Sequence, residues 1–377
     1  MSLSIGIVGL PNVGKSTLFN ALLKKQIALS ANYPFATIEP NVGVTEVPDE
    51  RLEKLAKVVD TEVIKPALVE FYDIAGLIKG AAQGEGLGNK FLSHIRETSA
   101  ICHVLRAFTD ENVIREGSVD PKQDLIAIRT ELQLADLEIL EKQKKPKGES
   151  DKKELQRWGF IQEFKQNLES GRNVFIFSLK DTKLNENLSE IDKEKLQLAK
   201  ELNLLTAKPE LFVINTDEEK LTEAKKIRTD FAQQLSQPEQ KIQPNQIVII
   251  SAKIESELVV LCEEDQELYM QDLGIDQSGL ERLARVAYET LGLQSFLTAG
   301  QKEVRAWTIR VGSTAAEAAG VIHTDFSKNF IKAKVANYDD FIKFGGWKGL
   351  KDHGKLRLEG RDYLMKPDDV VEFMIGK

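Results

Sequence analysis

Short apolar runs alternate with amphipathic stretches along most of this chain. In the stretches between most of the runs, apolar residues recur every three or four positions, which is the period of a helix. Buried strands that alternate with helices are typical of an α/β domain with a mostly parallel sheet. The runs that predict strands are Ser4–Leu10, Val42–Val47, Ala67–Ile74, Ala100–Phe108, Glu210–Asn215 and Gln246–Ala252.

The alternation stops between about Pro121 and Leu205, where helical patterns dominate. The polar stretch 144–154 predicts a solvated turn after a first long helix, and more helix is predicted over 155–171 and 188–202. We expect a helical hairpin inserted between two strands, which is stabilised by its own seam or serves to dock a partner. The apolar seam of the first helix is Leu125, Ile128, Leu132, Ala135 and Ile139.

After Leu291 the sequence pattern changes to short stretches of alternating apolar and polar residues separated by glycine-rich turns. This pattern predicts a small α+β domain. A chain of 377 residues is too long for one compact core. The expected domains are a sheet domain over 1–120 and 205–292, an inserted helical domain over 121–204, and a C-terminal domain over 293–377.

Composition indicates a globular protein, because 42% of the residues are hydrophobic and 29% are charged. The formal net charge of −8 argues against non-specific nucleic-acid binding by the chain as a whole. Residues 296–377 are the exception, with 14 Lys and Arg against 11 Asp and Glu. Contact between RNA and the C-terminal domain is therefore allowed by charge, although no aromatic-rich RNA-reading motif is visible there.

The two cysteines lie far apart, so they predict neither a disulfide framework nor a metal cluster. Cys102 lies in an apolar run and is expected to pack in the core, while redox activity of Cys102 or Cys262 stays open. The first residues lack the pattern of a signal peptide, and no apolar run has the roughly 18 residues of a membrane span. We expect a cytoplasmic protein that does not contact a membrane.

The clearest motif is GLPNVGKST, from Gly9 to Thr17, which fits G-x-x-x-x-G-K-[ST] between a predicted strand and a predicted helix. Such a loop points backbone N–H groups at phosphate oxygens and places them at a helix N-terminus. Lys15 is expected to reach the β- and γ-phosphates as a catalytic group, and the Ser16 hydroxyl to hold Mg²⁺. The predicted phosphate-binding residues are Asn12, Val13, Gly14, Lys15, Ser16 and Thr17.

Three further segments are typical of a switch that responds to the γ-phosphate. Asp73 and Gly76 have D-x-x-G spacing at the end of a predicted strand, so Asp73 is expected near Mg²⁺ and the Gly76 N–H near the γ-phosphate during catalysis. Thr37 lies between the first two strands and is the candidate for completing the Mg²⁺ shell. The glycine-dense stretch 80–91 is expected to reorder with the phosphate.

The base-recognition segment reads NTDE, from Asn215 to Glu218, where related GTPases have N-K-x-D. Thr216 replaces the lysine and Glu218 lengthens the carboxylate, so the segment loses the geometry with which a carboxylate rejects adenine. This favours ATP. Ser251, Ala252 and the following lysine match an S-A-K loop that also accompanies GTP binding, so spacing alone leaves both nucleotides open.

Together, GLPNVGKST, FATIEP, DIAGLIKGA, GEGLGNKFL, the N-x-x-E segment and EVRAWTIRVGSTAAEAAGVIHTDF resemble the YchF/Obg-like ATPase family over essentially the whole chain. The resemblance implies a P-loop domain, an inserted coiled-coil domain and a C-terminal β-grasp-like TGS domain. It also implies preference for ATP over GTP, or at least tolerance of both, and it implies ribosomes and, in some members, degradation or stress machinery as partners.

The resemblance also bears on mechanism. The family has a hydrophobic residue, here Leu77, where Ras-like enzymes have the glutamine that orients water, so we expect slow intrinsic turnover. A histidine proposed to help hydrolysis in many members aligns with Arg115, which would stabilise phosphoryl charge but is a poor base. Asn12 matches a position that binds K⁺ in some related enzymes, so K⁺ stimulation is an open prediction.

Three functions are therefore compared. The first is a Mg²⁺-dependent ATPase switch that associates with ribosomes. The second is an authentic GTPase, and the third is a scaffold that nucleotide stabilises without catalysis.

Overall fold

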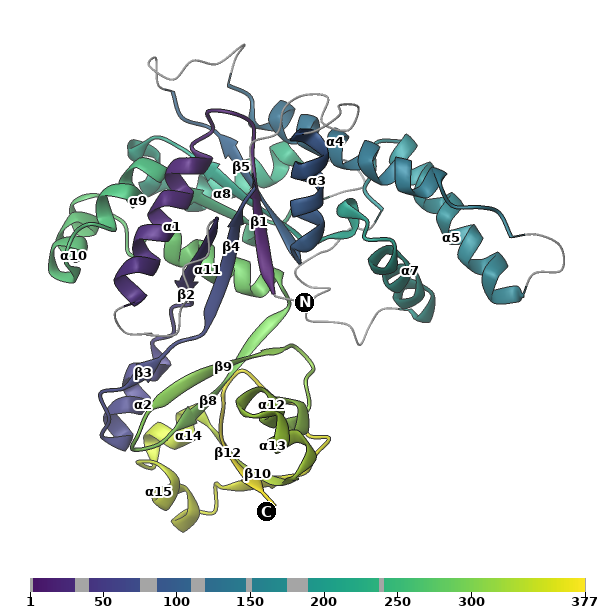
Figure 1. Cartoon of the computed structure of the whole chain (residues 1–377). Helices are drawn as coiled ribbons and strands as arrows, with labels where there is room; N and C mark the ends of the chain where they lie inside the picture. The colour runs from purple at the N-terminus through teal and green to yellow at the C-terminus, as the bar shows by residue number, and fades with distance from the viewer. Residues whose placement is uncertain are drawn as a thin grey trace. The chain divides into compact units, whose positions relative to one another are not determined.

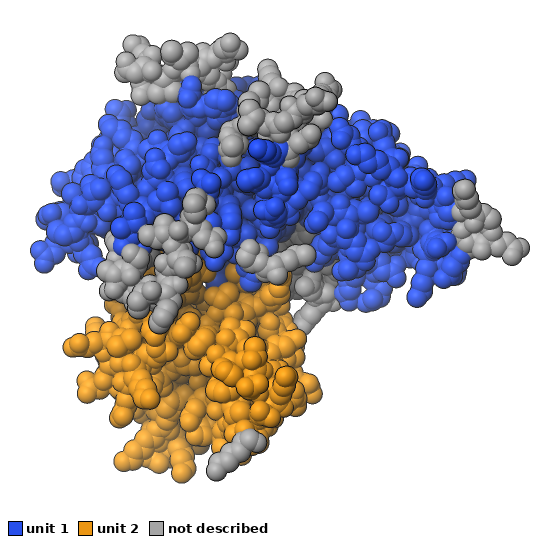
Figure 2. Space-filling model, viewed as in Figure 1, with its two compact units in different colours: residues 1–45, 70–291 blue, residues 46–69, 292–377 orange. Residues whose placement is uncertain are grey.

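The computed structural model describes the chain except for short internal segments and the ends. It forms two compact units, unit 1 from residues 1–45 and 70–291, and unit 2 from residues 46–69 and 292–377 (Figure 2). The described residues are 3–30, 41–74, 87–109, 119–146, 151–174, 189–236 and 241–376.

Unit 1 contains a six-stranded sheet with the order β2-β4-β1-β5-β6-β7. Neighbouring strands from β4 to β7 run parallel. All six predicted strands belong to this sheet, which confirms the α/β prediction. The strands are β1 (Ser4–Val8), β2 (Val42–Glu46), β4 (Leu68–Asp73), β5 (Ala100–Arg106), β6 (Glu210–Asn215) and β7 (Ile247–Ile250).

Helices connect these strands, and α4 and α5 extend from the sheet as an arm (Figure 1). None of the helices that the structure describes, in either unit, combines the length and apolar character of a membrane span. The helices of unit 1 are α1 (Lys15–Ser30), α3 (Leu87–Glu97), α4 (Pro121–Glu141), α5 (Lys152–Glu169), α7 (Glu190–Glu201), α8 (Ala224–Leu235), α9 (Ala252–Leu258), α10 (Glu263–Asp272) and α11 (Gly279–Thr290), with the 3₁₀ turns η1 (Leu205–Ala207), η2 (Glu218–Glu223) and η3 (Pro244–Gln246).

The apolar seam of α4 serves two cores. Leu125, Ile128, Leu132 and Ala135 are buried with residues of the sheet. Leu140 instead joins the arm core, whose other buried members come from α5, α7 and the residues around them. The first half of α4 therefore belongs to the packing of the sheet, and only its last turns contribute to the arm.

A buried carboxylate fixes the return of the chain from the arm to the sheet. The Asp136 side chain is fully buried and accepts hydrogen bonds from the backbone N–H groups of Leu205 and Thr206 and from the Thr206 hydroxyl, each at 2.8 Å. Burial raises the pKa of Asp136, and these hydrogen bonds oppose that rise. Because a buried carboxylate is stable only with such partners, α4 and η1 are held in one arrangement.

A second buried group joins α4 to strands β5 and β6. The Glu210 carboxylate accepts hydrogen bonds from Arg129 Nη2 at 2.5 Å and from Arg129 Nε at 3.3 Å, and His103 Nε2 lies 3.0 Å from it. Burial alone would raise the pKa of Glu210, but the Arg129 guanidinium and the His103 contact outweigh burial and lower this pKa to about 2. The arm is thus anchored to the sheet by a paired charge.

Unit 2 is built on a mixed sheet with the order β11-β10-β12-β8-β9-β3. Its apolar core is packed between this sheet and α12. The elements are β3 (Ile64–Lys65), β8 (Leu293–Ala299), β9 (Val304–Arg310), β10 (Phe330–Asn337), β11 (Arg357–Glu359), β12 (Asp369–Ile375), α2 (Arg51–Val59), α12 (Ala315–Ile322), α13 (Thr324–Lys328), α14 (Tyr338–Lys343) and α15 (Trp347–Asp352).

Residues 46–69 were assigned to the sheet domain from sequence, but they pack as part of unit 2. Strand β3 pairs in parallel with β9 at the sheet edge. Arg51, at the start of α2, donates hydrogen bonds to the Pro367 carbonyl at 2.7 Å and to Asp368 at 2.9 Å. The partners of β3 and of Arg51 lie about 240 to 320 positions further along the chain. Local sequence patterns do not reveal pairings over such distances, so the assignment of 46–69 could not be made from sequence.

Candidate nucleotide-binding site

The loop between β1 and α1 has the backbone conformation that a phosphate-binding loop requires. Gly14 has a φ of +88° and Asn12 a φ of +63°, both in the left-handed region. A Cβ on Gly9 would lie 2.9 Å from Val13 Cγ2 and 3.0 Å from the Val104 carbonyl oxygen. Glycine is therefore needed where the loop passes β5, and the loop delivers the chain directly to the N-terminus of α1.

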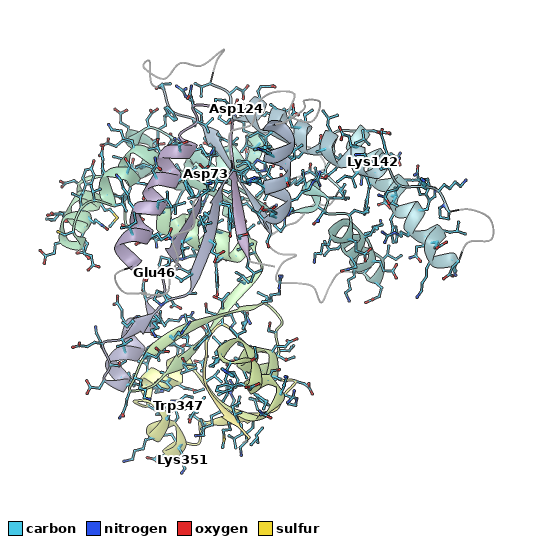
Figure 3. The ribbon with its side chains drawn as sticks, in the orientation of Figure 1. Glu46, Asp73, Asp124, Lys142, Trp347 and Lys351 are labelled. Carbon is cyan, nitrogen blue, oxygen red and sulfur yellow. The ribbon has the colours of Figure 1, made fainter. Side chains whose placement is uncertain are left out.

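Two predicted site residues, Lys15 and Asp73, form an ion pair with each other. Their side chains are 9% and 22% exposed, so the pair is largely shielded from solvent. The parallel pairing of β1 and β4, with Ile7 opposite Asp73, brings the end of β4 beside the phosphate loop. Asp73 lies at the carboxyl end of its strand (Figure 3), which is where ligands bind in sheets of this kind.

Asn215, at the end of β6, connects the phosphate loop to the S-A-K turn. Its Nδ2 donates a hydrogen bond to the Val13 carbonyl at 2.9 Å, and its Oδ1 accepts one from the Ala252 N–H at 2.9 Å. Asn215 is 5% exposed. A Cβ on Gly14 would lie 2.1 Å from Asn215 Nδ2, so the loop and the amide are in close contact. This side chain positions both loops, which is a role that the sequence interpretation did not include.

The other predicted base-side residues line one pocket of about 980 Å³ together with the phosphate loop. Thr216 is buried, and its N–H donates to the Ile250 carbonyl at 2.8 Å. Glu218 begins η2 and is exposed at the rim. Ser251 is buried and precedes α9. The volume is at the upper end of the range for small-molecule sites, as a nucleoside triphosphate needs.

Phe108 and Lys253 also line this pocket. Lys253 is the lysine of the S-A-K match, whereas the sequence interpretation did not single out Phe108. Phe108 follows β5 and supplies an apolar ring on which a base can stack. The Arg106 guanidinium lies 4.4 Å from the centre of this ring. The next residue, Thr109, donates its N–H to Asp217 at 3.2 Å, which ties this segment to the NTDE turn. No sequence motif marks Phe108, because its role depends on β5 lying beside β6.

A buried carboxylate on α9 joins the helix that follows the S-A-K turn to the start of α11. Glu255 on α9 accepts hydrogen bonds from the N–H groups of Gly279 at 2.7 Å and Leu280 at 3.3 Å, at the start of α11. Burial raises the pKa of Glu255, while these two hydrogen bonds oppose the rise. A Cβ on Gly279 would lie 2.4 Å from Ile250 Cγ1, so α9, α11 and β7 are packed without spare room.

The remaining predicted residues, Thr37, Gly76 and Arg115, lie outside the described residues, as does Leu77. For Mg²⁺, the described residues offer the exposed Ser16 hydroxyl, which lines the pocket, and the Asp73 carboxylate, which pairs with the adjacent Lys15. These are the oxygen ligands that Mg²⁺ prefers alongside phosphates and water. Among the described residues, no group of three His, Cys, Asp or Glu side chains converges into a self-sufficient metal site. The donor set fits a metal that arrives with phosphate.

A strand, a glycine-bearing loop, a lysine at a helix N-terminus and an aspartate at the neighbouring strand end define a P-loop nucleotide-binding protein. Residues 4–146 match the family model MMR_HSR1, described as a 50S ribosome-binding GTPase. Residues 293–376 match the model YchF-GTPase_C, a domain described as a protein of unknown function.

Full-length relatives refine this class. The chain is 44% identical over 384 residues to the Bacillus subtilis ribosome-binding ATPase YchF and 46% identical over 379 residues to that of Haemophilus influenzae, covering 99% of each chain. The solved structure of the Schizosaccharomyces pombe YchF GTPase has a TM-score of 0.82 and 34% identity, over 99% of this chain and 97% of that one. This chain belongs to the YchF family.

Proposed function

We propose that this protein is a Mg²⁺-dependent ATPase switch that associates with ribosomes in the cytoplasm. The observation that carries the proposal is the pocket in which the phosphate loop and Lys15 meet a base side formed by Thr216 and Glu218 in place of N-K-x-D. Lys15 pairs with Asp73 beside this pocket. Relatives at 44% and 46% identity named ribosome-binding ATPase support both the nucleotide and the partner.

In the proposed reaction, triphosphate oxygens replace Asp73 as the partner of Lys15. Exchange of one anion for another keeps the shielded ammonium paired, so binding does not expose a buried charge. The released Asp73 and the Ser16 hydroxyl would hold Mg²⁺, which neutralises charge that develops on the transferring phosphoryl group. The backbone N–H groups at the start of α1 hold the phosphates in place.

Selection between adenine and guanine depends on which side chains of the pocket are free to form hydrogen bonds with the base. Asn215 already uses its amide to connect two loops, so it offers the base little freedom. Discrimination then rests on Glu218, which is exposed at the rim and longer than the aspartate of N-K-x-D. A carboxylate that is not held in a buried position against guanine imposes little penalty on adenine. We therefore favour ATP, with slow turnover because Leu77 cannot orient water.

Hydrolysis is tested by ADP formation in purified protein with Mg²⁺, with and without ribosomes. We expect slow ADP formation that Lys15→Ala abolishes. Lys24→Ala is the matched control, because Lys24 is an exposed lysine of the same helix and is expected to leave the rate unchanged. If no ADP forms under either condition, the enzyme proposal is wrong and the scaffold remains.

The second candidate is an authentic GTPase, which the names of the family model and of the fission yeast structure favour. Competition binding of ATP and GTP decides between them, and a dissociation constant ten times lower for GTP would overturn the ATP proposal. Co-sedimentation with ribosomes in the presence of ATP, ADP or no nucleotide tests the switch. Equal binding in all three conditions would contradict nucleotide control while leaving hydrolysis intact.

A further inference from the structure

Two arginines of unit 1, Arg228 on α8 and Arg282 on α11, have no carboxylate partner among the residues that the structure describes. Both are half-buried, and no carboxylate oxygen of those residues lies within 4.0 Å of either guanidinium. The Nε atom of each is shielded from solvent and makes no hydrogen bond there. Arg282 Nη2 makes one long hydrogen bond, to the Ile249 carbonyl oxygen at 3.4 Å. Burial of a charged group without a partner costs free energy, so a bound anion would be stabilising at this place.

The two arginines come from helices on opposite faces of the sheet, beside strand β7. On one face, Ala232 and Leu235 of α8 share an apolar core with Ile249 of the strand. On the other face, α11 packs so closely that a Cβ on Gly279 would lie 2.4 Å from Ile250 Cγ1. Successive side chains of a strand point to opposite faces, which agrees with this arrangement. β7 is the last strand in the sheet order, so one side of its backbone has no neighbour among the described strands.

Both arginines lie close to this open side of β7. Arg228 is one turn before a core residue of α8, so it lies on the side of the helix that faces the strand. The Thr216 N–H donates to the Ile250 carbonyl from the side of β6. Because carbonyls alternate in direction along a strand, the Ile249 carbonyl, which Arg282 contacts, points to the open side. We call this place the edge site.

Burial and like charge both disfavour the arginine pair on its own. Burial lowers the pKa of Arg282, the Glu255 carboxylate opposes this fall, and the charge of Arg228 adds to it. Glu255 is already bound to the N–H groups at the start of α11. Two further carboxylates act on Arg282 more weakly, of which Glu281 lies 3.7 Å from a lysine of α1 and Asp276 is exposed. None of the three replaces a direct partner for the guanidinium groups.

We propose that the edge site binds a phosphate dianion between the guanidinium groups of Arg228 and Arg282. Each guanidinium presents parallel N–H donors to an oxyanion, and two of them from different helices suit a tetrahedral dianion better than a planar carboxylate with one charge. Arg285, exposed one turn after Arg282 on α11, adds positive charge nearby. The ligand is inorganic phosphate or the phosphate group of a small monoester, because both present the same dianion.

The edge site is separate from the nucleotide pocket. Neither Arg228 nor Arg282 is among the residues that line that pocket. The inference therefore goes beyond the proposed function, because it requires neither nucleotide nor hydrolysis. A bound phosphate is expected to stabilise unit 1, since it supplies the missing counter-charge and reduces the repulsion between the two arginines.

The first assay measures thermal unfolding of the full-length Lys15→Ala protein, in which the phosphate loop lacks its ammonium group. Phosphate at about 20 mM is compared with acetate and with chloride at equal ionic strength. For a dissociation constant of about 1 mM, we expect phosphate to raise the melting temperature by about 3–5 °C over chloride, and acetate to raise it by less than about 1 °C. Glycerol 3-phosphate distinguishes the two sources, because an equal rise extends the site to monoesters and no rise restricts it to the free ion.

Variants in the same background separate a built site from bulk charge, with phosphate binding measured by ³¹P NMR line broadening. Arg228→Gln and Arg282→Gln are each expected to weaken binding about tenfold, because one of the two guanidinium groups is lost. Arg228→Lys keeps the charge without the paired donors and is expected to weaken binding about threefold. Arg310→Gln is the matched control, because Arg310 is an exposed arginine of unit 2 that also lacks a carboxylate partner among the described residues.

Without phosphate, Arg228→Gln should be at least as stable as its parent, because it removes a cation that has no hydrogen bond to lose within the described residues. This variant decides the test even if Arg282→Gln fails to fold. The proposal is wrong if phosphate and acetate stabilise the protein equally, or if Arg228→Gln binds phosphate as well as Arg310→Gln does. A crystal soaked with selenate gives the position directly. An anomalous peak between the two guanidinium groups would support the edge site, and a peak at the phosphate loop alone would overturn it.

Discussion

Replacing Asn215 by alanine tests the central contact of the nucleotide site. The side chain joins the Val13 carbonyl to the Ala252 N–H through two hydrogen bonds of 2.9 Å. Val13 is 1% exposed and Ala252 is 2% exposed, so water has little access to either group. Asn215→Ala removes both bonds and leaves a buried acceptor and a buried donor without partners.

The cost follows from those two groups. An unsatisfied buried polar group costs about 1–3 kcal/mol, so two such groups, with partial relaxation of the loops, predict a loss of about 2–4 kcal/mol in the free energy of unfolding. Nucleotide affinity falls as well, because the phosphate loop and the S-A-K turn must be ordered again on binding. We expect a reduction of about ten- to a hundredfold for ATP and for GTP alike, which leaves their ratio unchanged.

Urea unfolding followed by circular dichroism and competition binding of both nucleotides measure these two effects. Asn215→Asp keeps the acceptor for Ala252 but turns a carboxylate oxygen towards the Val13 carbonyl, so it should be at least as damaging. Asn20→Ala, at an exposed position of α1, is the control and should change neither quantity. An altered ATP to GTP ratio with unchanged unfolding would refute the reasoning, because it would mean that Asn215 reads the base directly.

Three further outcomes are expected. Gly14→Ala should abolish measurable nucleotide binding in calorimetry, because its Cβ would lie 2.1 Å from Asn215 Nδ2 at a φ of +88°, whereas wild-type binding by this variant would contradict the loop geometry. The pKa of Glu210 is lowered in the folded state to about 2, whereas its unfolded pKa is near 4.3. The Glu210 carboxylate therefore adds about 3 kcal/mol to the free energy of unfolding above pH 4.3, and this contribution is lost as the pH falls towards 2. Acid unfolding of Glu210→Gln should lack this component, and parallel pH curves for variant and wild type would disprove it. Gly349→Ala should lower the stability of unit 2 in urea by about 1–3 kcal/mol, because its Cβ would overlap a backbone oxygen, whereas Gly360→Ala meets nothing within 4 Å and serves as control.

Much of the fold follows from local patterns. The six apolar runs became the six strands of one sheet, because a strand buried on both faces needs a continuous apolar run. The phosphate loop was identifiable for a similar reason, since glycines at fixed spacing before a lysine impose one backbone shape. The YchF family followed from these motifs and is confirmed by relatives that match 99% of the chain.

The tertiary structure decided which distant groups meet. No periodicity indicates that Lys15 pairs with Asp73, because this depends on β1 lying parallel to β4. The same is true of the Asn215 contacts and of residues 46–69, which pack in unit 2 although they lie between strands of unit 1.

The sequence by itself determined the six strands of the unit 1 sheet and the phosphate-loop motif, because these depend on neighbouring residues and on the fixed period of a strand. Only the tertiary structure decided that Asn215 connects two loops, that α4 serves two cores, and that Gly349 lets α15 approach the backbone of Phe344. The physical reason is that protein interiors are close-packed, so the position of each of these groups depends on how all the surrounding elements pack. Neighbours in the sequence do not specify that packing.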